Sequence, residues 1–149
     1  MSKTKPSVSL EAWIDGICEP VNPGGTAGYG LVVKRKHETV FRIAQAVGSG
    51  KGMSNNVAEY CGLIALLEWC KAQSVLQTVN VYSDSKLVVN QMRGVWRAKK
   101  GLYYPYYQQA ISLLHELGHN QFHFVWIPRE DNEEADELSR QAIAEVVIE

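Results

Sequence analysis

The first third of the chain shows apolar and polar residues in alternation, which is the period expected of β-strands. This pattern predicts strands over residues 8–18, 28–34 and 39–47. A loop at 19–27, with two prolines and two glycines, separates the first two strands, and a polar turn at 35–38 follows the second. Because these connections are too short for parallel crossovers, we expect an antiparallel meander.

The rest of the chain mixes helical and strand patterns. A glycine-rich loop at 48–54 leads into a helix predicted at 56–72, which is apolar on most of its circumference and therefore expected to be buried on more than one side. The later elements are a strand, two helices, a strand and a helix, predicted at 79–83, 85–92, 106–117, 121–127 and 132–146. No internal repeat or linker is visible, so the pattern predicts a flexible tail at 1–7 and a single domain at 8–149.

Composition narrows the class of protein only moderately. The chain has 149 residues, of which 46% are hydrophobic and 21% charged, and these values exclude a disordered or fibrous protein. A nucleic-acid binder usually carries a basic excess, whereas the net charge here is −1, so a nucleic-acid function must rest on local clusters of residues.

Cysteine usage and hydropathy predict the compartment. Cys18, Cys61 and Cys70 are odd in number and lack a C-x-x-C spacing, and no apolar signal core follows the polar first residues. These features predict a reduced, cytoplasmic protein without disulfides. The most apolar run, at 61–67, is far shorter than the ~20 residues of a membrane span, so we expect no membrane association.

Asp15 is the most unusual acidic residue of the chain, because strand alternation places it on one face with Trp13 and Ile17. A buried, unpaired carboxylate is costly, so the position indicates either a functional acid or an edge position where Asp15 points to water. Glu59 lies near the start of the first predicted helix. It could close a variant capping box with Asn56 as the N-cap, or it could be a site residue at the mouth of a buried helix.

Two further acids have equally ordinary explanations. Asp84 follows the strand predicted at 79–83, where an aspartate often caps the next helix, but where ligands of α/β sheets also bind. Asp136 lies about 100° around the last helix from Ala135, which belongs to the apolar stripe, so a solvated helix flank explains it by itself. None of the four acids identifies a site alone.

Four short segments carry these acids together with characteristic neighbours. They are Asp15-Gly16 with the Asn-Pro-Gly-Gly loop at 22–25, Ser-Asn-Asn-Val-Ala-Glu at 54–59, Ser-Asp-Ser at 83–85 and Asn-Glu-Glu-Ala-Asp-Glu-Leu-Ser at 132–139. Each segment is weak alone, but together they follow the motifs of the type 1 ribonuclease H family in the same order and on the same elements. The chain therefore resembles this family over most of its length.

The resemblance implies an α/β fold with a mixed five-stranded sheet of order 3-2-1-4-5, flanked by helices, and one catalytic domain at 8–149. It also implies an endoribonuclease that hydrolyses the RNA strand of RNA–DNA hybrids by two-metal-ion catalysis, with Mg²⁺ as the cofactor and Mn²⁺ as its usual substitute. The implied catalytic and metal-binding residues are Asp15, Glu59, Asp84 and Asp136. Asp15 and Asp84 would be the central ligands.

The same resemblance assigns residues to the two strands of a hybrid. On the RNA side, where 2′-hydroxyls distinguish RNA from DNA, it places Gly16, Cys18, Asn22 and Asn55. On the DNA side or its phosphate it places Ser54 and Asn56. Without the resemblance, loop and cap chemistry explains the asparagines equally well. RNA–DNA hybrid is thus the expected partner, activity on double-stranded RNA stays open, and we expect a monomer.

The chain departs from many family members in the loop before the last helix. Many members carry a histidine there, whereas this loop is Pro-Arg-Glu-Asp at 128–131, which is similar to an archaeal-like branch of the family. Arg129 could replace the histidine electrostatically, or it could be a solvent-facing cation. A short basic segment at 93–101 contains Arg93, Arg97, Lys99 and Lys100 around Trp96. It suits phosphate contacts and stacking, or is a solvated stretch around a buried tryptophan.

Three other functions remain to be compared. Another nuclease or a strand transferase of the same fold would share the acids, but the asparagine pair at 55–56 favours the ribonuclease. A nuclease-dead module that binds hybrid or other nucleic acid would fit the missing histidine, although all four acids are present. An unrelated hydrolase with two carboxylates, such as a glycosidase, would explain neither the asparagine pair nor the Asp84-Ser85 junction.

Overall fold

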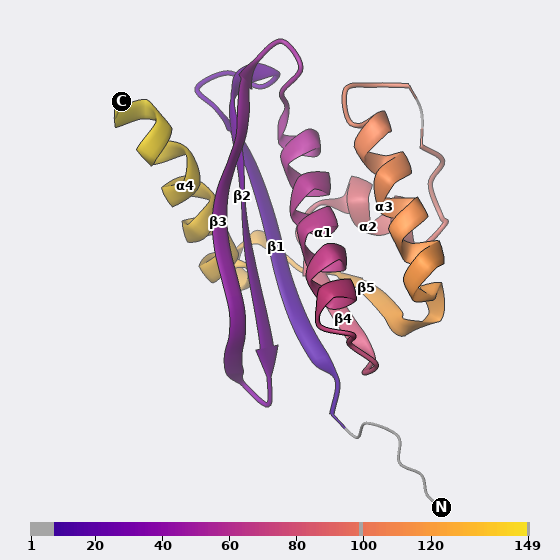
Figure 1. Ribbon diagram of the computed structural model, residues 1–149. Coiled ribbons are helices and arrows are strands. Elements are labelled where there is room, and N and C mark those ends of the chain that lie inside the picture. Colours follow the sequence, from indigo (N-terminus) through magenta and orange to yellow (C-terminus); the bar gives the residue numbers. More distant parts are fainter. Residues whose placement is uncertain (1–7, 99, 149) are drawn as a thin grey trace, which may run out of the picture.

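A mixed β-sheet forms the centre of the computed structural model, which describes residues 8–98 and 100–148 (Figure 1). The tail predicted at 1–7 lies outside these residues. In the described part of the chain the sheet has five strands in the order β3-β2-β1-β4-β5. Their bounds are Leu10–Glu19 for β1, Gly24–Arg35 for β2, Glu38–Gly50 for β3, Val79–Ser83 for β4 and Phe122–Trp126 for β5. β1, β2 and β3 are antiparallel, and β1-β4 and β4-β5 are parallel, so the predicted meander and strand order are confirmed.

Helices cover both faces of the sheet. Helices α1, α2 and α3 lie on one face and α4 lies on the other (Figure 1). Their bounds are Asn55–Ala72 for α1, Lys86–Met92 for α2, Tyr104–Leu117 for α3 and Glu133–Ile148 for α4. Two short 3-10 helices, η1 at His119–Gln121 and η2 at Arg129–Asp131, flank β5.

Several elements are longer than the sequence pattern predicts. β2 begins at Gly24 instead of residue 28 and β3 continues to Gly50 instead of ending at 47, because Gly24 and Gly50 still pair across register shifts that the glycine-rich ends tolerate. α3 begins at Tyr104 instead of 106, since Pro105 lies in the first turn, where its missing N–H leaves no helical hydrogen bond unmade.

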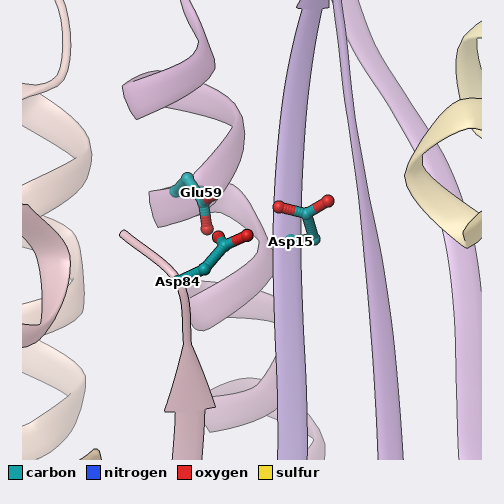
Figure 2. A group of neighbouring side chains, drawn as sticks. All are labelled: Asp15, Glu59 and Asp84. Carbon is teal, nitrogen blue, oxygen red and sulfur yellow. The ribbon is translucent and has the colours of Figure 1, made fainter. Parts of the chain in front are cut away.

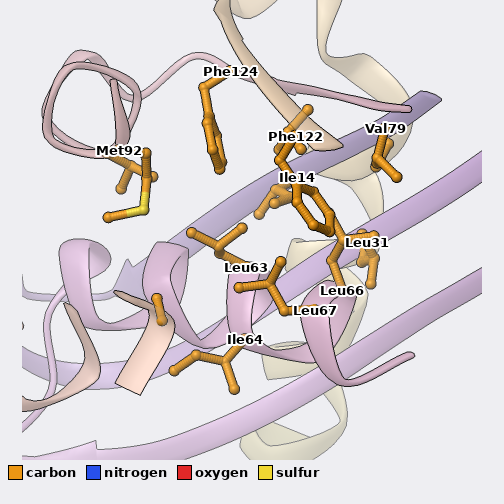
Figure 3. Packing of buried hydrophobic residues seen from close by; sticks show 14 of the residues in the cluster. Ile14, Leu31, Leu63, Ile64, Leu66, Leu67, Val79, Met92, Phe122 and Phe124 are labelled. Carbon is orange, nitrogen blue, oxygen red and sulfur yellow. The ribbon is translucent and has the colours of Figure 1, made fainter. Parts of the chain in front are cut away.

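The hydrophobic core lies between the sheet and α1. Leucines at positions 63, 66 and 67 of α1 pack against Ile14, Leu31, Val79 and Phe122 of four strands (Figure 3). Leu63, Leu66 and Leu67 are fully buried, so truncation of one of them to alanine should cost about 2–5 kcal/mol of stability. The expectation that α1 is buried on more than one side is confirmed, because its buried residues also include Val57, Ala58 and Cys70.

Glycines allow two helices to approach the sheet closely. A Cβ on Gly30 of β2 would lie 2.3 Å from the carbonyl oxygen of Ala135 in α4, and a Cβ on Gly16 of β1 would lie 2.5 Å from the backbone nitrogen of Glu59 in α1. Both neighbours are backbone atoms that cannot move aside easily, so both helices depend on these glycines. Within the described residues, no helix has the length and apolar composition needed to cross a membrane.

Candidate active site

Three carboxylates from distant parts of the chain meet at one end of the central strands. Asp15 comes from β1, Glu59 from α1 and Asp84 from the residue after β4, and one oxygen of each lies within 4.8 Å of the others. Figure 2 shows the side chains of Glu59 and Asp84 pointing toward one another, with Asp15 approaching from the neighbouring strand. The predicted convergence of these three acids is confirmed.

Strand register explains how Asp15 and Asp84 become neighbours. In the parallel pair β1-β4, Ile14 lies opposite Ser83, so the next residue on each strand brings the two aspartates side by side. Asp15 is also opposite Gly30 in the antiparallel pair β1-β2 and therefore shares the sheet face that α4 covers. A shift of one residue in either pair would move Asp15 to the other face.

Helix capping and close packing place Glu59. The hydroxyl of Ser54 accepts a hydrogen bond of 3.1 Å from the backbone N–H of Val57, so Ser54 is the N-cap of α1. The alternative in which Asn56 caps the helix and Glu59 completes a capping box is therefore wrong. Glu59 instead lies beyond the first turn, where the absence of a side chain on Gly16 lets α1 approach β1.

The capping alternative is also wrong for Asp84. Ser85 is the N-cap of α2 and accepts a hydrogen bond of 3.2 Å from the backbone N–H of Val88. The hydroxyl of Ser83 accepts a hydrogen bond of 3.0 Å from the backbone N–H of Ser85. Since both serines satisfy the backbone of this junction, the carboxylate of Asp84 is left to face Asp15 and Glu59.

Burial and mutual repulsion disfavour the charged forms of these acids. Burial raises the pKa of Asp15 to about 8, with further contributions from a hydrogen bond to Asp136 and from the charge of Asp84. Burial, followed by the charges of Asp15 and Asp84, also raises the pKa of Glu59 well above its ordinary value. Burial raises the pKa of Asp84 as well, although Arg129 acts in the opposite direction. Three acids with raised pKa values are held together at a cost that a bound cation would offset.

The donor set fits a hard divalent cation. Glu59 is 4% exposed, and its Oε1 is buried without a hydrogen-bond partner in the described part of the chain. Buried acceptors are normally satisfied, so this atom points to a ligand. Clustered carboxylate oxygens are the ligands that Mg²⁺ and Mn²⁺ prefer.

Asp136, the fourth predicted acid, reaches the same cleft but not the same cluster. It is half-buried on α4 and lines the cleft with the other three acids, but it does not belong to the three-residue group described above. Burial acts to raise the pKa of Asp136, but hydrogen bonds from Asp15 and Arg140 outweigh this effect and hold the pKa below its ordinary value. The solvated-flank explanation of Asp136 is therefore wrong, since the residue faces the cleft.

The cleft has a volume of about 470 Å³ and a polar lining. Of the residues predicted to contact substrate, those that line it are Gly16, Cys18, Asn22 and Asn55. Asn22 and Asn55 hold each other: Nδ2 of Asn22 donates to Oδ1 of Asn55 at 2.9 Å, and the backbone N–H of Asn55 donates to Oδ1 of Asn22 at 3.0 Å. Ser54 and Asn56 instead line a neighbouring hollow of about 290 Å³, which Asn22 and Asn55 also line.

Arg129 lies at the rim of the cleft. It is exposed on η2, lines the cleft, and acts to lower the pKa values of Asp15 and Asp84. Its position is thus compatible with the electrostatic role predicted for it, which stays a prediction. In the basic segment, Arg93, Arg97 and Lys100 are exposed and Lys99 lies outside the described residues. Trp96 is 46% exposed, so the alternative of a buried tryptophan is wrong.

Two residues of the 132–139 segment that were not predicted as site residues support the cleft from α4 and the residue before it. Asn132 is 1% exposed, and its Nδ2 donates a hydrogen bond of 2.8 Å to the carbonyl oxygen of Ile14. The hydroxyl of Ser139 lies 2.7 Å from the carbonyl oxygen of Asp136 and 3.4 Å from Oδ2 of Asp15. Both polar groups therefore fix α4 to the strand that carries Asp15. No sequence signal links Asn132 with Ile14, because the contact depends on the fold.

Further polar and aromatic residues that line the cleft were not predicted as site residues either. They are Glu19 at the end of β1, Ser85 after Asp84, Trp126 at the end of β5 and Arg140 on α4. The indole N–H of Trp126 donates a hydrogen bond of 3.2 Å to the carbonyl oxygen of Asp84. Arg140 follows Asp136 by four positions, a spacing that indicates an ion pair on a helix and could have revealed it.

Known proteins agree with this architecture. The family model described as reverse transcriptase-like matches residues 14–142. The bifunctional protein Rv2228c of Mycobacterium tuberculosis is 40% identical over 124 residues, which are 82% of this chain but 32% of that protein, so this chain spans about a third of that relative. Ribonuclease HI of Halobacterium salinarum is 30% identical over 134 residues, covering 90% of this chain and 64% of that protein.

Solved structures are similar over nearly the whole chain. LC11-RNase H1 in complex with an RNA/DNA hybrid has a TM-score of 0.83 and 32% identity, covering 93% of this chain and 99% of that one. The N-terminal RNase H domain of Rv2228c has a TM-score of 0.80 and 35% identity, covering 95% of this chain and 97% of that one. The chain therefore belongs to the reverse transcriptase-like family, and its domain is a ribonuclease H domain similar to those of type 1.

Proposed function

We propose that the protein is an endoribonuclease that hydrolyses the RNA strand of RNA–DNA hybrids. The observation that carries the proposal is the group of three carboxylates, Asp15, Glu59 and Asp84, within 4.8 Å of one another at the floor of an open polar cleft. The similarity of this chain to LC11-RNase H1, which was solved in complex with an RNA/DNA hybrid, supports the choice of substrate. A glycosidase would not need a third acid so close to the other two.

Divalent cations are the cofactors that this donor set favours. Asp15, Glu59 and Asp84 would hold them at the floor of the cleft, with Asp136 at its side, and Mg²⁺ is the proposed ion with Mn²⁺ as a substitute. When bound, such ions activate the attacking water and stabilise the leaving 3′ oxygen. The raised pKa values of Asp15 and Glu59 mean that cation binding must compete with protons at these acids.

Uncharged groups around the acids would orient the hybrid. Asn22 and Asn55 are exposed in the cleft and fixed by their mutual hydrogen bonds, so they can present amide groups to the RNA strand without first being ordered. Gly16 and Cys18 line the cleft beside them and would lie against the same strand.

The neighbouring hollow lined by Ser54 and Asn56 would receive the DNA strand or its phosphate. Arg129 is the cation proposed to act on the scissile phosphate in place of a histidine, because it lies at the rim beside Asp15 and Asp84. The exposed cations Arg93, Arg97 and Lys100, with Trp96, would extend these contacts along the hybrid.

The remaining expectations become part of the same proposal. We propose a single catalytic domain at 8–149 that acts as a monomer. Cys18, Cys61 and Cys70 are all free thiols, which supports a reducing cytoplasmic environment.

A cleavage assay with three duplexes tests the proposal. The full chain is incubated with RNA–DNA hybrid, double-stranded RNA and double-stranded DNA, each with Mg²⁺ and with chelator. We expect cleavage of the RNA strand of the hybrid with Mg²⁺ alone, and its loss in Asp84→Asn. Asp131→Asn, an exposed acid outside the cleft, is the matched control and should cleave normally.

Other outcomes would favour the alternatives. Tight binding of hybrid without cleavage by the wild type would indicate a nuclease-dead binding module. Equal cleavage by wild type and Asp84→Asn would show that the chemistry lies elsewhere. Cleavage of double-stranded DNA in preference to hybrid would indicate another nuclease of the same fold.

A further inference from the structure

Arg140 places a positive charge between acids from two different elements. It lies one turn after Asp136 on α4, and its Nε donates a hydrogen bond of 3.2 Å to Oδ2 of Asp136. Its Nη1 lies 3.7 Å from Oε2 of Glu19 at the end of β1. All three residues line the acidic cleft, so the guanidinium is part of the wall of the site.

An ordinary surface ion pair is the simplest explanation of this contact. Pairs with i,i+4 spacing on a helix contribute little to stability, and the side chain of Arg140 is 46% exposed. Two observations set this pair apart. Arg140 bridges α4 to β1 through Glu19. Its partner Asp136 is the one predicted acid outside the group of Asp15, Glu59 and Asp84, which it meets at the edge through a hydrogen bond with Asp15.

The charge of Arg140 is permanent under all relevant conditions. The hydrogen bond to Asp136 and the charges of Asp136, Glu19 and Asp15 raise the pKa of the guanidinium further. Because Arg140 stays protonated, its interaction with Asp136 can be broken only by movement of the Arg140 side chain. Because half of that side chain is exposed, such movement requires no repacking of the core.

We infer that Arg140 is a positioning residue that holds Asp136 at the rim of the cleft and competes with a divalent cation for this carboxylate. The inference rests on the proposed function, because it assigns Asp136 to the metal-binding acids. When a divalent cation binds, Asp136 exchanges Arg140 for that cation. Removal of the charge of Arg140 therefore frees the carboxylate oxygens of Asp136 and lowers the repulsion between the site and the incoming cation.

Calorimetric titration of the full chain with Mn²⁺, without substrate, tests the inference. We expect Arg140→Gln to bind Mn²⁺ about threefold to tenfold more tightly than the wild type, the range expected when one partly exposed cation is removed from beside a divalent ion. The rise in Tm produced by a fixed Mn²⁺ concentration should increase in parallel. Arg140→Lys keeps the charge and should remain within about twofold of the wild type.

The matched control is Arg42→Gln, which removes an exposed arginine of β3 outside the cleft and should leave Mn²⁺ affinity unchanged. High salt should narrow the gap between Arg140→Gln and the wild type, because it screens the competing charge. Equal affinities in Arg140→Gln and the wild type, or weaker binding in the variant, would overturn the inference while leaving the proposed function intact. No Mn²⁺ binding by the wild type would overturn both.

Discussion

The floor and the rim of the cleft differ in how their clustered negative charges are stabilised. At the floor, Asp15 and Glu59 are buried, and within the described residues neither acid forms a hydrogen bond or an ion pair with a cationic side chain. At the rim, Asp136 is paired with Arg140, and Arg129 and Glu19 are exposed. The floor is therefore rigid and electrostatically unfavourable without a cation, whereas the rim is balanced and adjustable. The backbone fixes the positions of the acids at the floor. At the rim, the long side chain of Arg140 can move and allow Asp136 to change its partner.

Asparagine substitution should separate the floor from the rim most strongly. Asp15→Asn should lower hybrid cleavage by more than about 100-fold, since even indirect partners of metal ligands cost 10–100-fold when removed. The same change should raise the Tm in chelator toward pH 8, because the folded protein then no longer has to take up a proton at this buried position. Asp136→Asn should reduce cleavage less and should not raise the Tm, since it also breaks the ion pair with Arg140. Equal effects of the two variants on Tm would contradict the distinction.

The pH dependence of stability should sharpen the same contrast. Burial first, and then the neighbouring acids, raise the pKa of Asp15 from 3.8 to about 8 in the folded protein, while the unfolded chain keeps a value near ~3.9. Between these values the folded state holds a proton that the unfolded state has lost. This stabilising contribution is therefore complete below pH ~4 and is lost as the pH rises to about 8.

Thermal melts in chelator across this range measure the effect. The wild type should lose Tm between pH 5 and 8, Asp15→Asn should lose less, and Asp131→Asn should follow the wild type. Added Mg²⁺ should restore most of the loss at pH 8, because it binds the deprotonated site. Identical pH slopes for the wild type and Asp15→Asn would show that Asp15 is not the group responsible.

Gly16 offers a test of how the floor is assembled. In Gly16→Ala the new Cβ would lie 2.5 Å from the backbone nitrogen of Glu59 and 2.8 Å from the carbonyl carbon of Ala58, so α1 must shift. We expect a loss of about 1–3 kcal/mol in the free energy of unfolding and weaker Mn²⁺ binding. Gly52→Ala is the matched control, because a Cβ there meets no atom within 4 Å. Chemical denaturation and Mn²⁺ titration of both variants measure these effects. If Gly16→Ala changed neither the free energy of unfolding nor the Mn²⁺ affinity, close packing of α1 on Gly16 would not be needed to place Glu59.

Substitution of Trp126 should have the smallest effect on activity, because its side chain contacts the floor only through a hydrogen bond to the backbone carbonyl of Asp84. Trp126→Phe keeps an aromatic ring beneath Lys86, whose Nζ lies 5.2 Å from the ring centroid, but removes the N–H that bonds to the carbonyl of Asp84. Loss of one partly exposed hydrogen bond should cost about 0.5–1 kcal/mol and lower kcat a few-fold. Steady-state kinetics on hybrid check this prediction, and an unchanged kcat would show that Asp84 is held without Trp126.

Sequence patterns predicted the order of the elements, and they predicted β4 at 79–83 to the residue, because its β-branched run has clear ends. The acids were selected by the resemblance of four short segments to the motifs of the type 1 ribonuclease H family, because the order of motifs along the chain is visible in the sequence. Sequence patterns could not identify Ser54 as the cap of α1, because Ser54, Asn55 and Asn56 are all good caps and only the backbone angles decide. The pairing of Arg140 with Glu19 was equally inaccessible, since it depends on how α4 crosses the sheet.

The closeness of Gly16 to Glu59 has a consequence for the history of this protein. A chain that acquires any side chain at position 16 must push α1 away, and with it the acid that completes the floor. Descendants that keep the chemistry are therefore expected to keep glycine at this position, whereas descendants that abandon the chemistry are released from that requirement. Gly16, which has no functional group of its own, is thus expected to be a sensitive marker of whether a lineage keeps the proposed chemistry.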